Sequence, residues 1–214
     1  MNKKTIDIYI DFKSPYAYLA LEPSIIFAKK NKLNINWLPY VLEIPDFLGS
    51  AEVDNNGNVI KSKRNAHQWR RVKYSYMDCR RYANAKSMIV RGPQKIWNTK
   101  LISIALLWTK KNNNNKHTLS FIKHVFEKFW RREYDLENIE IICNTLKNIG
   151  LDSNGFKKWS KENGKKELNL IIDKAHKKGV FGVPSYFIGN ELFWGREQIP
   201  MIKARISGDY SKLI

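Results

Sequence analysis

The chain is poor in cysteine, and this shortage excludes two classes of protein. Its 214 residues include only Cys79 and Cys143, which lie far apart in the sequence. Neither belongs to a Cys-x-x-Cys pair or lies near clustered histidines, so we expect neither a disulfide framework nor a metal site. We interpret both cysteines as inert packing residues, the usual state of a free cysteine in a reducing compartment.

Long hydrophobic runs are also missing. No apolar stretch approaches the roughly 20 residues that a membrane-spanning helix needs. Residues 1–4 lead directly into a predicted strand, without the apolar segment and small-residue cleavage site of a signal peptide. We therefore expect a cytoplasmic protein with no membrane partner.

Acidic residues are few, 20 against 38 Lys and Arg, which gives a net charge of +18. A cationic surface attracts phosphates and carboxylates, although general enrichment in lysine and asparagine explains part of the excess. The densest stretch, Lys61 to Arg81, holds eight basic residues and the single acid Asp78. It predicts either a solvated helix face or the wall of a site for an acidic small molecule.

The N-terminal pattern predicts a strand followed by a helix. Hydrophobic and polar residues alternate over 6–11, which is typical of a strand with unlike faces. Ser14 and Pro15 then form a helix start, because serine accepts a bond from a free amide and proline suits the first helical position. We expect the helix to run towards Lys30, with a kink or restart caused by Pro23.

A second strand is predicted over 34–40, so the chain opens with a βαβ unit. The ligand crevice of such a unit lies at the carboxyl end of the first strand, where Ser14 is placed. After Pro45 and the polar segment 49–62, the periodicity is helical for roughly a hundred residues. The expected helices are 66–83, 94–111, 118–132, 136–149 and 154–164, with breaks at Gly92-Pro93, the asparagine tract and Gly150.

Aromatic residues recur at helical spacing in this region, and we interpret them as core. They are Trp97, Trp108, Phe121, Phe126, Phe129 and Trp130. A further helix is predicted from about Lys166 to Lys178, ended by Gly179. Residues 186–194 then predict a hairpin around Gly189-Asn190, and a last helix should begin near 196–197.

A strand, a helix carrying the reactive group in its first turn, and a late Val-Pro entering a hairpin resemble the thioredoxin fold. Redox members open that helix with Cys-x-x-Cys, whereas this chain has residues 14–17, Ser-Pro-Tyr-Ala. It therefore cannot cycle its own disulfide there. A hydroxyl and a helix N-terminus both favour a thiolate, so Ser14 fits the stabilisation of an external thiol. The alternative is an ordinary helix cap.

A Ser-His-Asp arrangement finds little support, since no Gly-x-Ser-x-Gly context accompanies the four histidines. Residues 11–20, residues 179–184 and residues 191–195 resemble the signatures of the 2-hydroxychromene-2-carboxylate isomerase family. That family is related to kappa-class glutathione transferases and to Dsb-type oxidoreductases. Between these segments, 70–81 and 91–93 are similar to its helical insertion, so the likeness spans nearly the whole chain.

The resemblance implies an α/β thioredoxin-like fold with a large all-helical insertion. Residues 1–45 and 166–214 would form the discontinuous thioredoxin-like domain, and residues 46–165 the insertion. It also implies that Ser14 hydrogen-bonds the sulfur of glutathione, and that Val183, before a cis Pro184, pairs its backbone with the cysteinyl part.

Residues 195–197 occupy the place where the family shows a small or amide residue followed by aspartate. Glu197 keeps the acid that would hold the γ-glutamyl amino group, and Arg196 is a departure from the pattern. A basic residue of the insertion would reach the glycyl carboxylate. Arg71 is the first candidate, with Arg70 and Lys73 as close rivals, and each has a solvated-surface alternative.

Three functions follow from these patterns. The first is a glutathione-dependent isomerase of a small acidic aromatic substrate, with the thiol as recycled nucleophile and a homodimer as a reasonable state. The second is a kappa-like transferase or peroxidase at the same site. The third, a basic module for nucleic acid or acidic protein, ranks last because no recognised reading motif is present.

Overall fold

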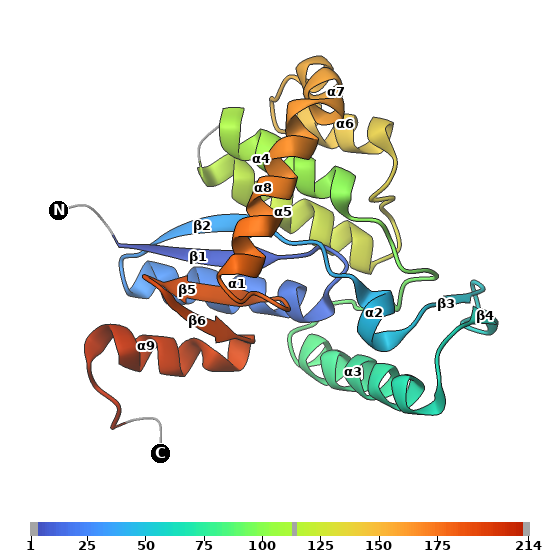
Figure 1. Cartoon of the computed structure of the whole chain (residues 1–214), viewed down its shortest axis with the longest axis horizontal. Helices are drawn as coiled ribbons and strands as arrows, with labels where there is room; N and C mark the ends of the chain where they lie inside the picture. The colour runs from blue at the N-terminus through green and yellow to red at the C-terminus, as the bar shows by residue number, and fades with distance from the viewer. Residues whose placement is uncertain (1–3, 113–114, 212–214) are drawn as a thin grey trace.

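The opening βαβ unit is present in the computed structural model, which describes residues 4–112 and 115–211 (Figure 1). Strands β1 (Thr5–Ile10) and β2 (Asn34–Pro39) pair in parallel, and helix α1 (Pro15–Lys30) connects them. The register is in step, with each residue of β1 opposite one residue of β2. The predicted strand, helix and strand are therefore confirmed.

Helix α1 continues through Pro23 without the restart that was one expected outcome. The hydroxyl of Ser24 donates to the carbonyl of Ala20 at 2.7 Å and also meets the Tyr186 hydroxyl at 3.0 Å. Leu21 and Phe27 are buried on either side of the proline. Packing on both sides holds the helix together and overrides the local preference for a break.

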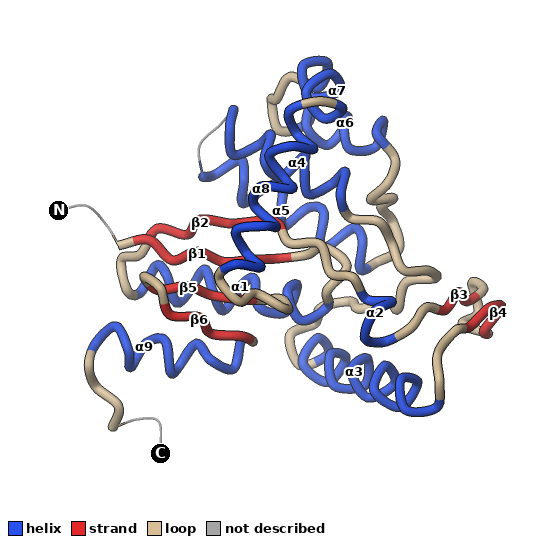
Figure 2. Tube along the Cα trace, viewed as in Figure 1, coloured by secondary structure: helices blue, strands red, loops and turns tan. Residues whose placement is uncertain are grey.

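Two C-terminal strands complete a four-stranded sheet in the order β2-β1-β5-β6. Strands β5 (Ser185–Ile188) and β6 (Glu191–Trp194) form the predicted hairpin around Gly189-Asn190. Helix α8 (Asn163–Lys177) lies on one side of the sheet, and α1 and α9 (Ile199–Ser207) lie on the other (Figure 2). A short 3-10 helix, η1 (Arg196–Gln198), joins β6 to α9.

The segment between β2 and α8 is mostly helical, as expected. Its helices are α2 (Ile44–Leu48), α3 (Ala66–Asn84), α4 (Lys100–Asn112), α5 (Asn115–Trp130), α6 (Ile139–Asn148) and α7 (Ser153–Lys161). The predicted aromatic core is confirmed: Trp97 is partly buried against the core and the other five aromatics are buried. Phe126 contacts Phe12 and Tyr18, so the aromatic cluster joins this segment to the thioredoxin-like part.

The prediction that the insertion is entirely helical is wrong for one segment. Residues 51–62 form a hairpin of β3 (Ala51–Val53) and β4 (Val59–Ser62). Asp54 builds its turn by accepting bonds from the amides of Asn56 and Asn58 at 2.9 and 2.8 Å. Asp and Asn side chains favour such turns. The strands are too short to give a readable alternation, which is why the sequence shows only a polar segment.

Helix α4 begins six residues later than predicted, because Glu137 holds the preceding loop. Its carboxylate accepts bonds from Lys95 Nζ at 2.7 Å and from the Asn98 amide at 2.8 Å. Helix α6 likewise starts after Asn138, which caps it, and α8 already starts at Asn163. A loop contact and a cap, rather than hydrophobic periodicity, set the starts of α4 and α6.

Cys79 and Cys143 are both buried and free, which confirms them as packing residues. Across residues 4–112 and 115–211, no helix combines the length and hydrophobicity needed to cross a bilayer. The predicted break in the asparagine tract falls partly on residues 113 and 114, which lie outside the described residues.

Candidate functional site

Most of the predicted site lies where β1 and β6 end and β5 begins, and we call this end of the sheet the site edge. Tyr9 near the end of β1 is opposite Ser185 at the start of β5, and Ser185 is opposite Trp194 at the end of β6. The segment that leaves β1 towards Ser14, the Val183-Pro184 dipeptide and residues 195–197 therefore share this edge. Helix α1 also contacts η1.

A buried carboxylate shapes the turn before Ser14. Asp11 is fully buried, and its oxygens accept bonds from the Leu42 amide at 2.8 Å and from the Lys13 amide at 3.2 Å. Lys13 Nζ lies 3.5 Å from the same carboxylate, and Lys13 is only 6% exposed. Burial raises the pKa of Asp11, while the Lys13 cation and the amide bonds oppose that rise.

Ser14 is the N-cap of α1, so the cap alternative is confirmed as one of its roles. Its hydroxyl oxygen accepts a bond from the Ala17 amide at 3.2 Å. Within the described residues the hydroxyl donates no hydrogen bond, which leaves its proton available to a ligand. The side chain is only 4% exposed, so a ligand has a narrow approach to it.

The Val183-Pro184 peptide bond is cis, as the resemblance implied. The Pro184 carbonyl accepts a bond from the Gly195 amide at 2.9 Å, which fixes the dipeptide against the end of β6. In the described part of the chain, neither the amide nor the carbonyl of Val183 has a hydrogen-bond partner. Both groups are free to pair with an extended ligand.

Arg196 and Glu197 lie at this edge but face different surroundings. The Arg196 guanidinium stacks over the Tyr82 ring of α3, 3.5 Å from its centroid, so it joins η1 to α3. The Glu197 side chain is exposed and folds over Gly195, where a Cβ would collide with its carboxylate. Among the described residues no cation pairs with Glu197, so this acid is available to an amine.

Helical geometry separates the three basic candidates of α3. Arg71, Ser75, Asp78 and Tyr82 form one stripe, because residues three and four apart share a helix face. This stripe borders the site, since Asp78 accepts a bond from Tyr16 of α1 at 3.3 Å and Tyr82 packs under Arg196. Arg71 lies seven residues from Asp78, about 10 Å along the helix.

The rivals lie on other faces of α3. Arg70 and Lys73 line a cavity of ≈ 450 Å³ together with Val59, Ala66 and Trp69. That cavity faces the β3-β4 hairpin and not α1. Arg71 is therefore the one of the three basic residues on the site side, although it lies apart from the strand ends that hold Ser14 and Val183.

Tyr16 and Cys79 form the buried contact between α1 and α3. Cys79 is inaccessible, and burial raises the pKa of its thiol to about 12, so it stays protonated and unreactive. Burial also raises the pKa of the Tyr16 hydroxyl, which donates to Asp78. The sequence showed Tyr16 within the Ser14 motif, but its partner 62 positions away had no local signal.

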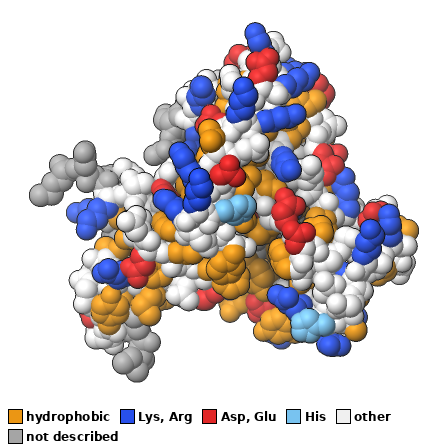
Figure 3. Space-filling model, in the orientation of Figure 1, with side chains coloured by type: hydrophobic (Ala, Val, Ile, Leu, Met, Phe, Trp, Pro, Cys, Tyr) orange, Lys and Arg blue, Asp and Glu red, His pale blue; other side chains and the backbone are white. Residues whose placement is uncertain are grey.

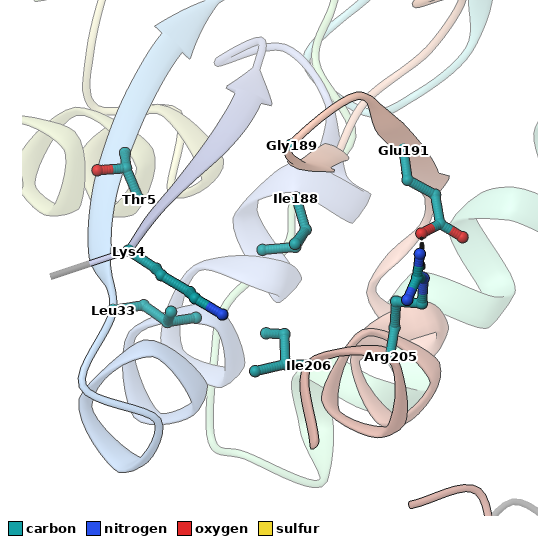
Figure 4. A pocket seen from close by; sticks show the side chains of 8 residues that line it. All are labelled: Lys4, Thr5, Leu33, Ile188, Gly189, Glu191, Arg205 and Ile206. Carbon is teal, nitrogen blue, oxygen red and sulfur yellow. Dashed lines mark hydrogen bonds and ion pairs between the residues drawn. The ribbon is translucent and has the colours of Figure 1, made fainter. Parts of the chain in front are cut away.

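A second cavity lies at the opposite edge of the sheet (Figure 4). It has a volume of ≈ 440 Å³ and is lined by residues at the start of β1 and around the β5-β6 turn, where Glu191 pairs with Arg205 at 2.6 Å. Neither this cavity nor the one beside the hairpin is lined by Ser14 or Pro184. The candidate site thus lies between helix α3 and the end of the sheet where β1 and β6 finish and β5 begins.

A helix cap next to a cis-proline loop, at the end of a β2-β1-β5-β6 sheet, defines a protein of the thioredoxin fold without the redox cysteines. The DSBA-like thioredoxin domain family matches residues 5–207. The chain therefore belongs to the DsbA-like thioredoxin family.

Relatives named 2-hydroxychromene-2-carboxylate isomerase resemble almost the whole chain. The Sphingobium xenophagum protein is 24% identical over 94% of this chain and 97% of its own length. The Pseudomonas putida protein is 25% identical over 93% of this chain and 92% of its own length. The resemblance inferred from the two end segments is confirmed.

Solved structures show the same fold. A 2-hydroxychromene-2-carboxylate isomerase structure has a TM-score of 0.72 at 19% identity and covers 95% of each chain. The cytosolic disulfide reductase DsbM from Pseudomonas aeruginosa, solved with GSH, has a TM-score of 0.62 at 10% identity. It covers 95% of this chain and 99% of its own.

The buried pair of Asp11 and Lys13 gives a stability prediction. We expect Asp11→Asn to lower the free energy of unfolding by about 3 kcal/mol, because it leaves the Lys13 cation buried and unpaired. The double variant Asp11→Asn with Lys13→Met should recover more than half of that loss. Urea denaturation followed by circular dichroism measures both, and equal losses in the two variants would contradict the role of the pair.

Proposed function

We propose that this protein is a glutathione-dependent isomerase of the 2-hydroxychromene-2-carboxylate type. The observation that carries the proposal is Ser14 at the start of α1, where redox relatives have cysteine, with a hydroxyl proton that has no acceptor among the described residues. The names of the relatives support isomerisation as the reaction class.

The donors and acceptors at the edge fit glutathione part by part. The Ser14 hydroxyl and the positive end of α1 would favour the thiolate and lower the pKa of the bound thiol. The free amide and carbonyl of Val183 would pair with the cysteinyl unit. Exposed Glu197 would meet the γ-glutamyl ammonium, and Arg71 would meet the glycyl carboxylate.

The burial of Ser14 limits how the ligand can approach. Ser14 is only 4% exposed, and we propose that the thiol approaches its hydroxyl from the side of the cis-proline loop. Arg196 is held on Tyr82 and serves to position η1 and thereby Glu197. An aromatic substrate could pack against an aromatic side chain near Ser14. Phe12 and Tyr18 are buried in the core, so half-buried Tyr16 is the candidate for this contact.

When bound, glutathione would supply a thiolate that adds reversibly to a conjugated carbon, permits rotation about the former double bond, and is released unchanged. Both cysteines of the described residues are buried, and burial keeps the Cys79 thiol protonated, so the nucleophile we propose is the sulfur of glutathione. The residues of the chain would bind glutathione and the substrate and orient them. The excess of basic side chains on α3 suits an acidic substrate.

The first prediction concerns the hydroxyl of Ser14. Calorimetric titration should show that the wild-type protein prefers glutathione over S-methylglutathione by about tenfold or more, as expected for a hydrogen bond to a charged sulfur. We expect Ser14→Gly to abolish this preference and to reduce glutathione-dependent turnover.

Glycine is the suitable replacement at this position, because it costs a helix cap only a few tenths of a kcal/mol. An unchanged melting temperature would show that the start of α1 tolerates the loss of the Ser14 hydroxyl. Equal affinity of the wild-type protein for the two ligands would refute a thiolate held by Ser14.

The second prediction compares two neighbouring arginines. Arg71→Ala should weaken glutathione binding about tenfold, because a charge-assisted bond to the glycyl carboxylate is lost. Arg70→Ala removes the same charge from the outer face of α3, about 100° around the helix from Arg71. It should leave the affinity within about twofold, since surface substitutions away from a site have small effects. If Arg70→Ala has the larger effect, the assignment of the stripe is wrong.

The third prediction separates isomerisation from transfer. With 2-hydroxychromene-2-carboxylate and a catalytic amount of glutathione, we expect many turnovers, a product that lacks sulfur, and a constant concentration of free thiol. Mass spectrometry of the product and thiol titration measure these. A sulfur-containing product with stoichiometric loss of thiol would instead establish a kappa-like transferase.

A further inference from the structure

The β3-β4 hairpin carries hydrophobic side chains that the rest of the described chain does not cover. The hairpin projects beyond the N-terminal end of α3 (Figure 1). Ile60 is 70% exposed and Val59 is 53% exposed, and all four residues of β4 are exposed. Exposed aliphatic groups that cluster in this way are typical of a contact surface.

The solvent-exposed face of α3 continues this surface. Arg70, Tyr74, Met77 and Arg81 are spaced so that they share the face opposite the buried side of the helix. Tyr74 is 57% exposed and Met77 is 47% exposed. The exposed face of α3 therefore presents Tyr74 and Met77, with an arginine before and after them.

The ≈ 450 Å³ cavity between the hairpin and α3 joins the two parts. Val59, Ala66 and Trp69 provide its apolar walls, and Arg70 and Lys73 provide cations. We call the whole surface the basic hydrophobic face. It consists of Val59, Ile60, Trp69, Arg70, Lys73, Tyr74 and Met77.

The charge of this region favours an anionic partner. Eight basic residues lie between 61 and 81. Of the acids in the hairpin and α3, Glu52 is opposite Lys61, Asp54 is bound in the turn, and Asp78 faces Tyr16 on the flank towards α1. Figure 3 shows Lys and Arg side chains next to hydrophobic ones on the lobe where the hairpin and α3 lie.

We infer that the basic hydrophobic face binds the surface of an anionic lipid bilayer. Val59 and Ile60 enter the boundary of the acyl chains, Trp69 and Tyr74 lie at the headgroup level, and Arg70 and Lys73 meet lipid phosphates. A second copy of the chain would oppose like charges. Nucleic-acid bases stack on flat rings, whereas the most exposed residue of this face, Ile60, is aliphatic.

This inference departs from the sequence-based expectation of no membrane partner. Peripheral binding needs no spanning helix, because a few inserted side chains and several cations act together. It stands apart from the proposed isomerase function, since Ser14 and Val183 lie at the strand edge and contribute nothing to this face.

Vesicle flotation tests the inference with the full chain. We expect the wild-type protein to float with vesicles containing about one third phosphatidylglycerol at least tenfold better than with pure phosphatidylcholine vesicles. Ile60→Asp should reduce this binding about tenfold, and so should Arg70→Ser combined with Lys73→Ser, at physiological salt.

Matched controls lie on α8, on the other side of the molecule. Leu170 is 58% exposed, so Leu170→Asp makes the same change as Ile60→Asp at a distant site. Lys165→Ser with Lys166→Ser removes two exposed charges. Neither control should reduce flotation by more than about twofold, a small surface effect.

Four outcomes would overturn the inference. They are equal binding to both vesicle types, equal effects of the Ile60 and Leu170 variants, preferential binding to single-stranded DNA, and a wild-type dimer that Ile60→Asp dissociates. The last two would assign the face to nucleic acid or to a second copy. Circular dichroism of each variant distinguishes lost binding from lost folding.

Discussion

The carboxylate of Asp11 is the interaction on which the candidate site depends. It accepts the Leu42 amide at 2.8 Å, so it joins the exit of β1 to the exit of β2. It also accepts the Lys13 amide at 3.2 Å and thereby sets the direction in which the chain enters Ser14 and α1. A buried acid with these partners is costly to charge, and the burial of Lys13 beside it is the compensation.

The chain has the thioredoxin fold of its family, but residues 14–17 at the start of α1 contain no cysteine. The free groups at the edge are a hydroxyl proton at Ser14, the main chain of Val183 and the carboxylate of Glu197. Each of these groups is available to a ligand, and none of them is a redox group. The same scaffold therefore suits a reaction in which the reactive sulfur arrives with the ligand and leaves with it.

Local patterns predicted the sheet, α1, the C-terminal hairpin and the aromatic core, because each depends on periodicity or on a turn within a few residues. They could not predict contacts between distant segments, such as Tyr16 with Asp78 or Arg196 with Tyr82. The hairpin at 51–62 was missed because its strands are too short to alternate clearly. The sequence thus supplied the candidate residues of the site, whereas the separation of Arg71 from Arg70 and Lys73 became visible only from the contacts of α3 with its neighbours.

The sheet is assembled from the two ends of the sequence, and this order matters while the polypeptide is being made. β1 and β2 leave the ribosome first, whereas β5 follows only after the long intervening helical segment, a delay on the order of ten seconds. During that interval one edge of β1 has no neighbour and is open to mispairing with other nascent chains. A message truncated before codon 183 would thus yield a chain that contains Ser14 but lacks β5, β6 and the second half of the candidate site.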